Sequence, residues 1–482
     1  MPKPNLSFYA TAFLLMGVID LSAQSKKMST TKAAVIKSVE THSADLIKIS
    51  DEIWANAETA LRETKSAKVL ADYAEAQGFR VKRSVAGMPT AFVAEYGSGR
   101  PIIGIMGEYD ALPGISQKAQ PTPDPLHAGA GGHGCGHNLF GAGSLGAAIA
   151  VKELLAAGKL KGTLRFYGTP AEEAVGGKIY MGREGLFNDL DVCLDWHPGA
   201  EIAANTQSSQ AMVDFVVEFK GRAAHAAADP WNGRSALDGV ELFLDGVNML
   251  REHVHPSVRM HYVIKAGGQV PNVVPEYAAI WMWVRDSQRT GVEEVFARVK
   301  DIAKGAALMA GVESTVRVQS GDYEILVNQL GAETLQKNIE ALGPINYTPD
   351  EIAFAKKIQE VSHVDQTGLD GAIHPLQKTK EDPDGGSTDV GDISWIVPEI
   401  SAYVTTAPAK APWHSWAVVA CGGMSIGHKG MLYAAKSLAM TMVDLFENEA
   451  LRKNIRAEFE KRRGGHVHKP YIPEGPPPVP VE

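Results

Sequence analysis

The feature that most constrains the fold is an alternation of short apolar segments with helix-like segments. Four segments have the length and the apolar content of buried strands, at 91–96, 101–106, 163–167 and 191–196. Segment 101–106 is apolar throughout, as expected for a strand that is buried on both faces. Segments with helical spacing occur at 30–62, 67–78 and 139–158. This alternation predicts an α/β fold with a mainly parallel sheet.

The pattern changes near residue 208, where strands with one polar face replace the apolar runs. Alternating segments occur at 212–219, 260–264, 278–285 and 315–319, with helical segments at 234–252 and 291–310. They predict an inserted α+β unit of the ferredoxin-like kind at 208–320. We therefore expect a first domain in two parts, 30–207 and 321–462, followed by an extended proline-rich tail at 463–482.

Composition narrows the class of protein. The chain has 482 residues and a formal net charge of −9 at pH 7, which argues against nucleic acid as a partner. Its three cysteines are too few for a disulfide framework. A soluble enzyme or binding protein with more than one domain is the remaining expectation.

The N-terminus has the pattern of a secretory signal peptide. Lys3 precedes an apolar run at 8–19, and the small residues Ser22 and Ala23 follow it. This run is too short to span a bilayer, so we expect no membrane partner. The pattern predicts removal of residues 1–23 and export, to the periplasm. The alternative is that Met28 is the true start of a cytoplasmic protein.

A glycine-rich stretch at 132–138 carries the first chemical signal. Cys135 and His137 lie two residues apart with glycines around them, and glycine permits the tight turns that aim both side chains at one spot. A thiolate and a neutral imidazole are good ligands for zinc and similar divalent metals.

Further candidate ligands follow the apolar segments, at the point where each one ends. Asp110, the pair Glu172 and Glu173, and His197 each come after a different predicted strand, and His414 follows the last one at 400–404. Ligands of a parallel sheet bind beyond the carboxyl ends of its strands. Of two adjacent carboxylates, one can bind a metal while the other acts as general base. The sequence therefore predicts a metal site at this edge.

The chain resembles the M20 family of metallopeptidases and amidohydrolases. It is most similar to the branch that contains the B subunit of aminobenzoyl-glutamate hydrolase. Eight motifs in family order carry the resemblance: Gly-Glu-Tyr-Asp-Ala-Leu-Pro (107–113), Gly-His-Gly-Cys-Gly-His-Asn (132–138), Gly-Thr-Pro-Ala-Glu-Glu (168–173), Trp-His-Pro (196–198), Gly-Arg-Ala-Ala-His-Ala-Ala (221–227), Pro-Asn-Val-Val-Pro-Glu (271–276), Gly-Ser-Thr-Asp-Val-Gly-Asp (386–392) and His-Ser-Trp (414–416).

The resemblance implies a zinc-exopeptidase-like catalytic domain that holds two divalent ions, zinc or manganese. The implied metal ligands are Cys135, His137, Glu173, His197 and His414. Glu172 matches the general base, and Asp110 matches an acid that orients a ligand. His428 competes with His414 as the last ligand, and His414 is preferred because it follows the last strand.

The inserted unit matches the dimerisation, or lid, domain of the family. There His225 corresponds to a histidine that reaches the partner subunit's site, Asn272 is expected to hold substrate, and Arg285 is a candidate for pairing with a substrate carboxylate. The implied reaction is hydrolysis of the amide of a small N-acyl or aroyl amino acid, such as aminobenzoyl-glutamate, or of a dipeptide. A homodimer is expected, with a related second subunit as an open possibility.

Two other functions compete with this one. Residues 141–146 spell the dinucleotide-binding pattern G-x-G-x-x-G, but the expected strand directly before it is missing. A metal-binding subunit without activity of its own is the second alternative, and the filled catalytic positions count against it.

Overall fold

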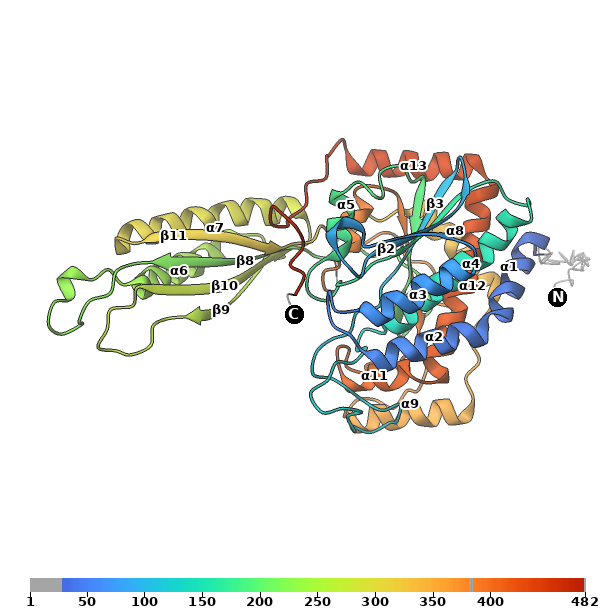
Figure 1. The fold of residues 1–482 in the computed structure, drawn as a ribbon, viewed down its shortest axis with the longest axis horizontal. Coiled ribbons are helices and arrows are strands. Elements are labelled where there is room, and N and C mark those ends of the chain that lie inside the picture. The colour runs from blue at the N-terminus through green and yellow to red at the C-terminus, as the bar shows by residue number, and fades with distance from the viewer. Residues whose placement is uncertain (1–27, 381–382, 384, 481–482) are drawn as a thin grey trace, which may run out of the picture.

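The computed structural model describes residues 28–480 except 381–382 and 384 (Figure 1). The predicted signal peptide at 1–23 therefore lies outside the described residues. The chain forms a large domain and a small domain that projects from one side of it (Figure 1).

A mixed sheet of six strands forms the centre of the large domain, in the order β1-β2-β4-β3-β5-β12. The strands are β1 (Arg80–Arg83), β2 (Phe92–Ser98), β3 (Ile102–Gly107), β4 (Gly162–Gly168), β5 (Val192–Leu194) and β12 (Glu399–Ile400). The four strands from β4 to β12 are parallel, and β1 and β2 are antiparallel additions. This confirms the predicted α/β class with a mainly parallel mixed sheet.

Helices cover both faces of this sheet because its strands are apolar on both sides. On one face α4 (His137–Ala156) packs against β3 and β4, with α1 (Thr30–Thr41), α2 (Ser43–Asn56), α3 (Thr64–Ala76), α8 (Gln329–Leu342) and α12 (Ser425–Glu447) in the same core. The other face packs against α5 (Gly177–Arg183) and α10 (Val390–Ser394). Within the described residues α4 is the one helix long and apolar enough to cross a membrane, and most of it is buried in the core.

The glycines of the G-x-G-x-x-G pattern serve close packing of α4. A Cβ at Gly141 would lie 2.6 Å from the backbone oxygen of Glu108, and one at Gly146 would lie 2.6 Å from Leu46. A loop precedes α4 where a dinucleotide fold needs a strand. The fold therefore gives no support to the dinucleotide alternative.

Smaller elements complete the large domain. A three-stranded sheet has the order β6-β13-β7, with β6 (His197–Gly199), β7 (Ala203–Ala204) and β13 (Ala402–Thr405). The remaining helices are α9 (Pro349–Val361), α11 (Trp416–Gly422) and α13 (Glu449–Arg463). No helix was predicted from the sequence for the segment of α13. Residues 464–480 have no regular structure, and the carbonyl of Pro473 accepts a hydrogen bond from Arg183.

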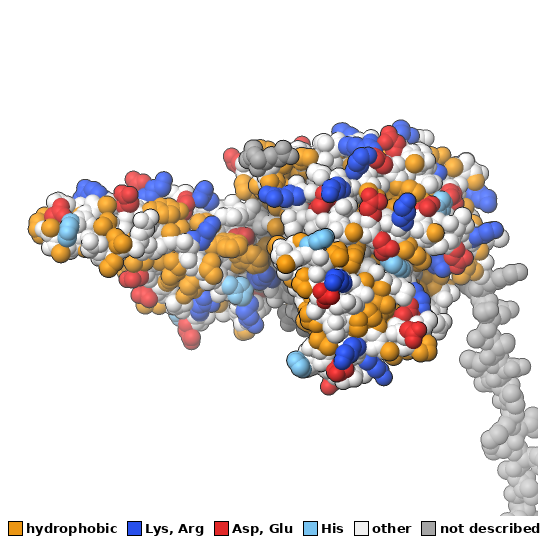
Figure 2. Space-filling model, turned by 60° about the horizontal axis from the view of Figure 1, so that its bottom comes forward, with side chains coloured by type: hydrophobic (Ala, Val, Ile, Leu, Met, Phe, Trp, Pro, Cys, Tyr) orange, Lys and Arg blue, Asp and Glu red, His pale blue; other side chains and the backbone are white. Residues whose placement is uncertain are grey.

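The small domain is an antiparallel sheet with two helices on one face. Its strands β8 (Ala211–Lys220), β9 (Arg259–Ala266), β10 (Tyr277–Asp286) and β11 (Glu313–Ser320) have the order β11-β8-β10-β9. The helices α6 (Ala236–Leu250) and α7 (Arg289–Ala310) share a separate core with the sheet. This order and the βαββαβ sequence confirm the ferredoxin-like prediction. Hydrophobic side chains remain exposed along this domain (Figure 2), among them Val263, Ile264 and Trp281.

Candidate metal centre

The predicted ligands lie where the parallel strands end. Asp110 follows β3, Glu172 and Glu173 follow β4, and His197 begins β6 shortly after β5. Because β3 pairs in parallel with both β4 and β5, these ends meet at one edge of the sheet.

Cys135 and His137 reach the same edge through a tight turn at the start of α4. Gly136 between them has φ 79°, in the left-handed region that glycine tolerates best. A Cβ at Gly134 would lie 3.1 Å from the Cα of His414, so this glycine permits the close approach of the final predicted ligand. The backbone N–H of His414 also donates to the carbonyl of Gly134 at 3.1 Å.

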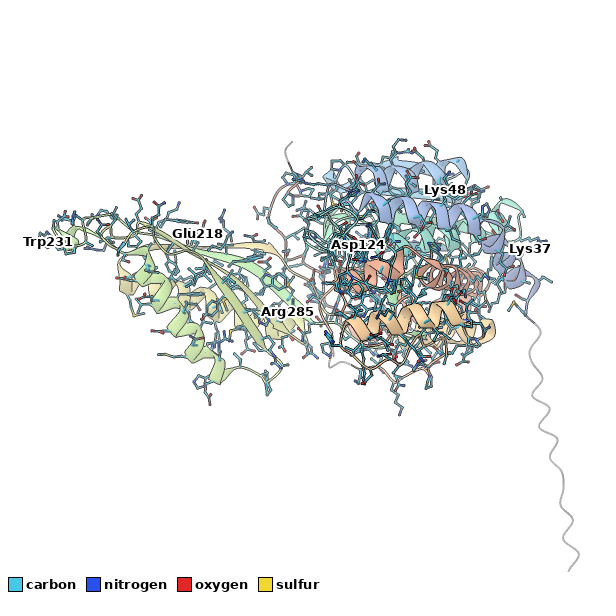
Figure 3. The ribbon with its side chains drawn as sticks, turned by 90° about the horizontal axis from the view of Figure 1, so that it is seen from below. Lys37, Lys48, Asp124, Glu218, Trp231 and Arg285 are labelled. Carbon is cyan, nitrogen blue, oxygen red and sulfur yellow. The ribbon has the colours of Figure 1, made fainter. Side chains whose placement is uncertain are left out.

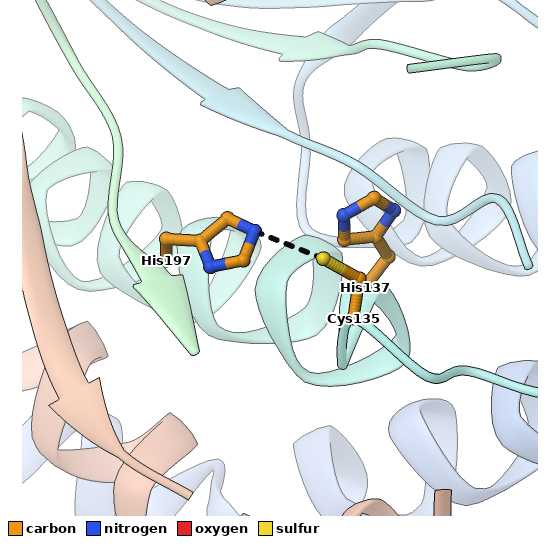
Figure 4. A group of neighbouring side chains, drawn as sticks. All are labelled: Cys135, His137 and His197. Atoms are coloured by element: carbon orange, nitrogen blue, oxygen red, sulfur yellow. Dashed lines mark hydrogen bonds between the residues drawn. The ribbon is translucent and has the colours of Figure 1, made fainter. Parts of the chain in front are cut away.

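Five side chains form two ligand groups that share one sulfur. Ligand atoms of Cys135, His137 and His197 lie within 4.8 Å of one another (Figure 4), and so do those of Cys135, Glu173 and His414. The Cys135 sulfur therefore borders both groups. This arrangement suits two neighbouring divalent ions with a bridging thiolate.

Hydrogen bonds fix which nitrogen of each buried imidazole carries the proton. Nδ1 of His197 lies 2.7 Å from the carbonyl of Pro198 and donates to it, which leaves Nε2 facing the Cys135 sulfur at 3.4 Å. Nδ1 of His137 lies 3.0 Å from Oδ1 of Asp110 and donates to that carboxylate. In the neutral form of each ring, Nε2 thus keeps a lone pair for a metal.

The second group is more open to solvent. The imidazole of His414 is 56% exposed, and its Nε2 lies 3.7 Å from the Glu173 carboxylate. His414 also has φ 56°, in the left-handed region, and one of its ring nitrogens lies within 4.8 Å of the Cys135 sulfur. His428, the alternative last ligand, instead pairs with Asp51 at 2.8 Å.

The charges of the site fit a divalent cation. Burial raises the pKa of Glu173 to about 7, with smaller contributions from Asp110 and Glu108. Burial, Glu108 and Glu173 raise the pKa of Glu172 well above its usual range. Burial likewise raises the pKa of the Cys135 thiol to about 12. Each of these groups is therefore costly to ionise where it lies, and a bound cation would favour the ionised ligands.

Unpartnered polar atoms point to the same place. Oε1 of Glu173 and Nε2 of His137 are buried without a hydrogen bond. Nε2 of His137 lies 2.9 Å from Oε2 of Glu108, but the angles of that contact are not those of a hydrogen bond. Buried polar atoms normally have a partner, so the nitrogen and oxygen atoms left open here, beside the Cys135 sulfur, fit a metal ion.

Three predicted site residues lie on the small domain. His225 and Asn272 lie on adjoining segments, since the N–H of Ala226 donates to the carbonyl of Asn272 and His225 forms a β-bridge with Val273. The loop of His225 also contains Trp231, at the end of the small domain far from the metal ligands (Figure 3). The structure therefore does not bring this pair to the ligands of its own chain.

Arg285 lies near the junction of the two domains (Figure 3). Its guanidinium donates to Ser387 at 3.3 Å and stacks over the ring of Trp283.

Several charged residues near the site were not singled out from the sequence. Glu108, Lys178 and Asp389 are buried and in contact with one another through the lysine, next to the ligands. Glu108 and Asp389 belong to the motifs at 107–113 and 386–392, but neither was itself proposed as a site residue. Lys178 follows a pair of glycines, which is the only sequence feature that could have drawn attention to it. The rings of Tyr403 and Trp413 lie 6.1 Å and 6.3 Å from that of His197.

Comparisons with known proteins agree on the family. The model of peptidase family M20/M25/M40 matches residues 104–414. The B subunit of p-aminobenzoyl-glutamate hydrolase from Escherichia coli K12 is 38% identical over 463 residues, covering 90% of this chain and 96% of that protein. The human Xaa-Arg dipeptidase is 30% identical over 436 residues, covering 86% and 88%. A solved structure described as a dinuclear metal-binding peptidase of the M20 family, from Bacillus subtilis, matches the fold with a TM-score of 0.57 at 17% identity, covering 85% and 99%.

Proposed function

This chain belongs to the peptidase family M20/M25/M40, and from that premise we propose that it is a metal-dependent hydrolase of small N-acyl or aroyl amino acids or dipeptides. The observation that carries the proposal is the pair of ligand groups that share the Cys135 sulfur. We propose that these groups hold two divalent ions, zinc or manganese, with Cys135 between them.

The residues around the ions have distinct roles in amide hydrolysis. Two bound divalent ions would lower the pKa of a water between them and polarise the amide carbonyl. Glu172 belongs to neither of the two ligand groups, but one of its oxygens lies within 4.8 Å of ligand atoms of His137 and Glu108. It accepts the proton of the attacking water and passes it to the leaving nitrogen. Asp110 keeps His137 in the tautomer that binds metal.

His225 supplies a donor for the developing negative charge on the carbonyl oxygen. Its Nδ1 accepts hydrogen bonds from the backbone N–H groups of Ala227 and Ala228, at 3.2 Å and 3.1 Å. The proton of the neutral imidazole is therefore on Nε2, which is free to donate. Since its loop lies far from the ligands of its own chain, we propose that a second copy receives it, in a homodimer formed through the small domain (Figure 3). The exposed apolar side chains of that domain support such a contact.

The choice of substrate rests on the relatives and on the surface beside the metal ligands. The names of two relatives specify aminobenzoyl-glutamate and Xaa-Arg dipeptides. Tyr403 and Trp413 offer aromatic faces next to His197, which suits a flat acyl group. We propose that Asn272, on the loop beside His225, contacts the substrate from the partner copy, and that Arg285 pairs with a substrate carboxylate near the domain junction.

Two further proposals concern the setting of the enzyme. The relative in Escherichia coli is named as the B subunit of its hydrolase, so a related second chain is a candidate partner. The apolar run at 8–19 supports export to the periplasm. Fractionation of cells that express the full chain, followed by mass measurement of the mature N-terminus, tests export directly.

The function is tested by one variant at the proposed general base. Metal-reconstituted protein is assayed on aminobenzoyl-glutamate, hippurate and a set of dipeptides. We expect Glu172→Gln to retain the metal and the melting temperature of the parent while kcat falls by about 10³-fold or more. Glu184→Gln, at the exposed end of α5, is the matched control and should keep full activity. Comparable activity in Glu172→Gln would refute the role of that residue.

A further inference from the structure

Lys178 is a buried lysine next to the metal ligands. Its side chain has no exposed surface, and its Nζ lies 2.5 Å from Oε1 of Glu108 and 2.5 Å from Oδ1 of Asp389. Both carboxylates are buried as well. A charged lysine is placed in a protein interior only where opposite charges compensate for its lost hydration.

These three residues join three separate parts of the chain. Glu108 directly follows β3, Lys178 lies in the first turn of α5, and Asp389 precedes α10. Asp389 holds Lys178 at two points, because its Oδ2 also accepts the backbone N–H of Lys178 at 2.9 Å. The contacts therefore fix the start of α5 against the ends of two other segments.

The segment fixed in this way is the one that presents Glu172 and Glu173. Residues 169–176 connect β4 to α5 and follow a tightly constrained path. Ala171 has φ 63°, and its N–H donates to the buried carboxyl group of Glu63 at 3.0 Å. A Cβ at Gly177 would lie 2.0 Å from the carbonyl oxygen of Pro170, so the two ends of the segment touch.

A single carboxylate, that of Glu108, lies between Lys178 and the proposed catalytic groups. Oε1 of Glu108 contacts Lys178, and Oε2 lies 2.9 Å from Nε2 of His137. Ligand atoms of Glu108, His137 and Glu172 lie within 4.8 Å of one another. Two carboxylates in so small a volume repel each other, and the ammonium of Lys178 offsets that repulsion.

We propose that Lys178 is a positioning residue for the hydrolytic reaction: through Glu108 and Asp389 it holds the segment that places Glu172 and Glu173 at the metal ions. This inference rests on the proposed function. A purely stabilising role is the competing account, since replacing one partner of a buried ion pair generally destabilises a protein. The two accounts differ in what happens to the molecules that remain folded.

The experiment compares Lys178→Met with a matched control, Lys32→Met. Lys32 also pairs with a carboxylate, Asp444 at 2.7 Å, but it joins α1 to α12 and contacts none of the proposed ligands. Both proteins are loaded with Co²⁺, and the folded fraction, the cobalt absorption spectrum, kcat and KM are measured. The spectrum reports the geometry of the metal ligands without any need for turnover.

We expect Lys178→Met to shift the cobalt spectrum and to lower kcat per folded, metal-loaded molecule by about 100-fold, with KM changed by less than about threefold. Lys32→Met should keep the parent spectrum and kcat. Asp389→Asn keeps the size and an acceptor for the Lys178 N–H while it removes the charge, so it decides the matter if Lys178→Met does not fold. If Lys178→Met, or Asp389→Asn in its place, folds and keeps the cobalt spectrum and kcat of the parent, the proposal is overturned. If the parent cleaves no amide, the proposed function fails, and the cobalt spectra still decide the role of Lys178.

Discussion

Asp110 accepts a hydrogen bond from Nδ1 of His137 at 3.0 Å, with both side chains fully buried. The second oxygen of the same carboxylate accepts the backbone N–H of Glu173 at 2.9 Å. One side chain therefore orients a member of each ligand group. Because the affinity of a metal site depends on the groups that orient its ligands, a change at Asp110 should alter metal affinity.

Substitution of Asp110 by Asn should weaken metal binding. An amide oxygen is a poorer acceptor than a carboxylate, so His137 loses part of its orientation and basicity. We expect the dissociation constant for Zn²⁺ to rise by about 10- to 100-fold, measured by competition with a chromophoric chelator. Asp51→Asn is the matched control, because Asp51 pairs with His428 at 2.8 Å away from the ligands. Equal Zn²⁺ affinities for Asp110→Asn and the parent would show that Asp110 does not support the site.

Mixing two inactive variants tests the proposed contribution of a second copy. Glu172→Gln lacks the general base and His225→Ala lacks the donor, so each homodimer should be nearly inactive. In a mixed dimer one site combines an intact Glu172 with an intact His225 from the other chain. Random exchange should restore about a quarter of parental activity, because half of the dimers are mixed and one of their two sites is complete. A mixture no more active than the sum of its components rules out the exchange of His225 between copies.

The buried carboxyl of Glu63 should make stability depend on pH. Burial, with a smaller contribution from Asp110, raises its pKa from 4.5 to about 8. A carboxyl whose pKa is raised on folding favours the folded state below pH 4.5, and that contribution is lost as pH rises toward 8. The free energy of unfolding should therefore fall across this window.

Glu63→Gln provides the comparison, because a neutral amide can still accept the N–H of Ala171. The free energy of unfolding of Glu63→Gln, relative to that of the parent, should increase from pH 4.5 to pH 8. It is measured by urea unfolding with a chelator present. If the free energy of unfolding changes with pH in the same way in both proteins, Glu63 does not bind a proton on folding.

The sequence predicted the fold well where hydrophobic periodicity was strong. The continuous run of β3 and the alternating strands β10 and β11 formed as expected, because burial on two faces or on one face dictates those patterns. Strand β8 also formed, but it is buried on both faces along most of its length. The short polar strand β1, Arg80–Arg83, was not predicted, since pairing at the edge of a sheet leaves little trace in composition. The helix α13 was likewise missed, because it is rich in charge and buries only Ile455 and Phe459.

The proposed ligands Glu173, His197 and His414 were singled out because each follows an apolar strand, and Cys135 and His137 because of their glycine-rich loop. The charged residues that support them were not singled out. Sequence periodicity does not predict that Lys178 contacts Glu108 and Asp389, because these residues are 70 and 211 positions away from it in the chain. Likewise, the sequence associated His225 with the site only through the family resemblance. Its loop lies on the small domain, away from the proposed ligands of its own chain (Figure 3), which is why we propose that it acts in a second copy.

The most direct test is the metal content of the native protein and of Cys135→Ser, measured by plasma mass spectrometry after equilibration with Zn²⁺ or Mn²⁺ and removal of free metal. Our account predicts about two divalent ions per folded chain in the parent and a marked loss in Cys135→Ser, because the shared sulfur borders both ligand groups. Cys421→Ser, which changes a buried cysteine outside both groups, should keep the parental content. A parent protein that retains no divalent metal, or a Cys135→Ser protein that binds as much as the parent, would contradict it.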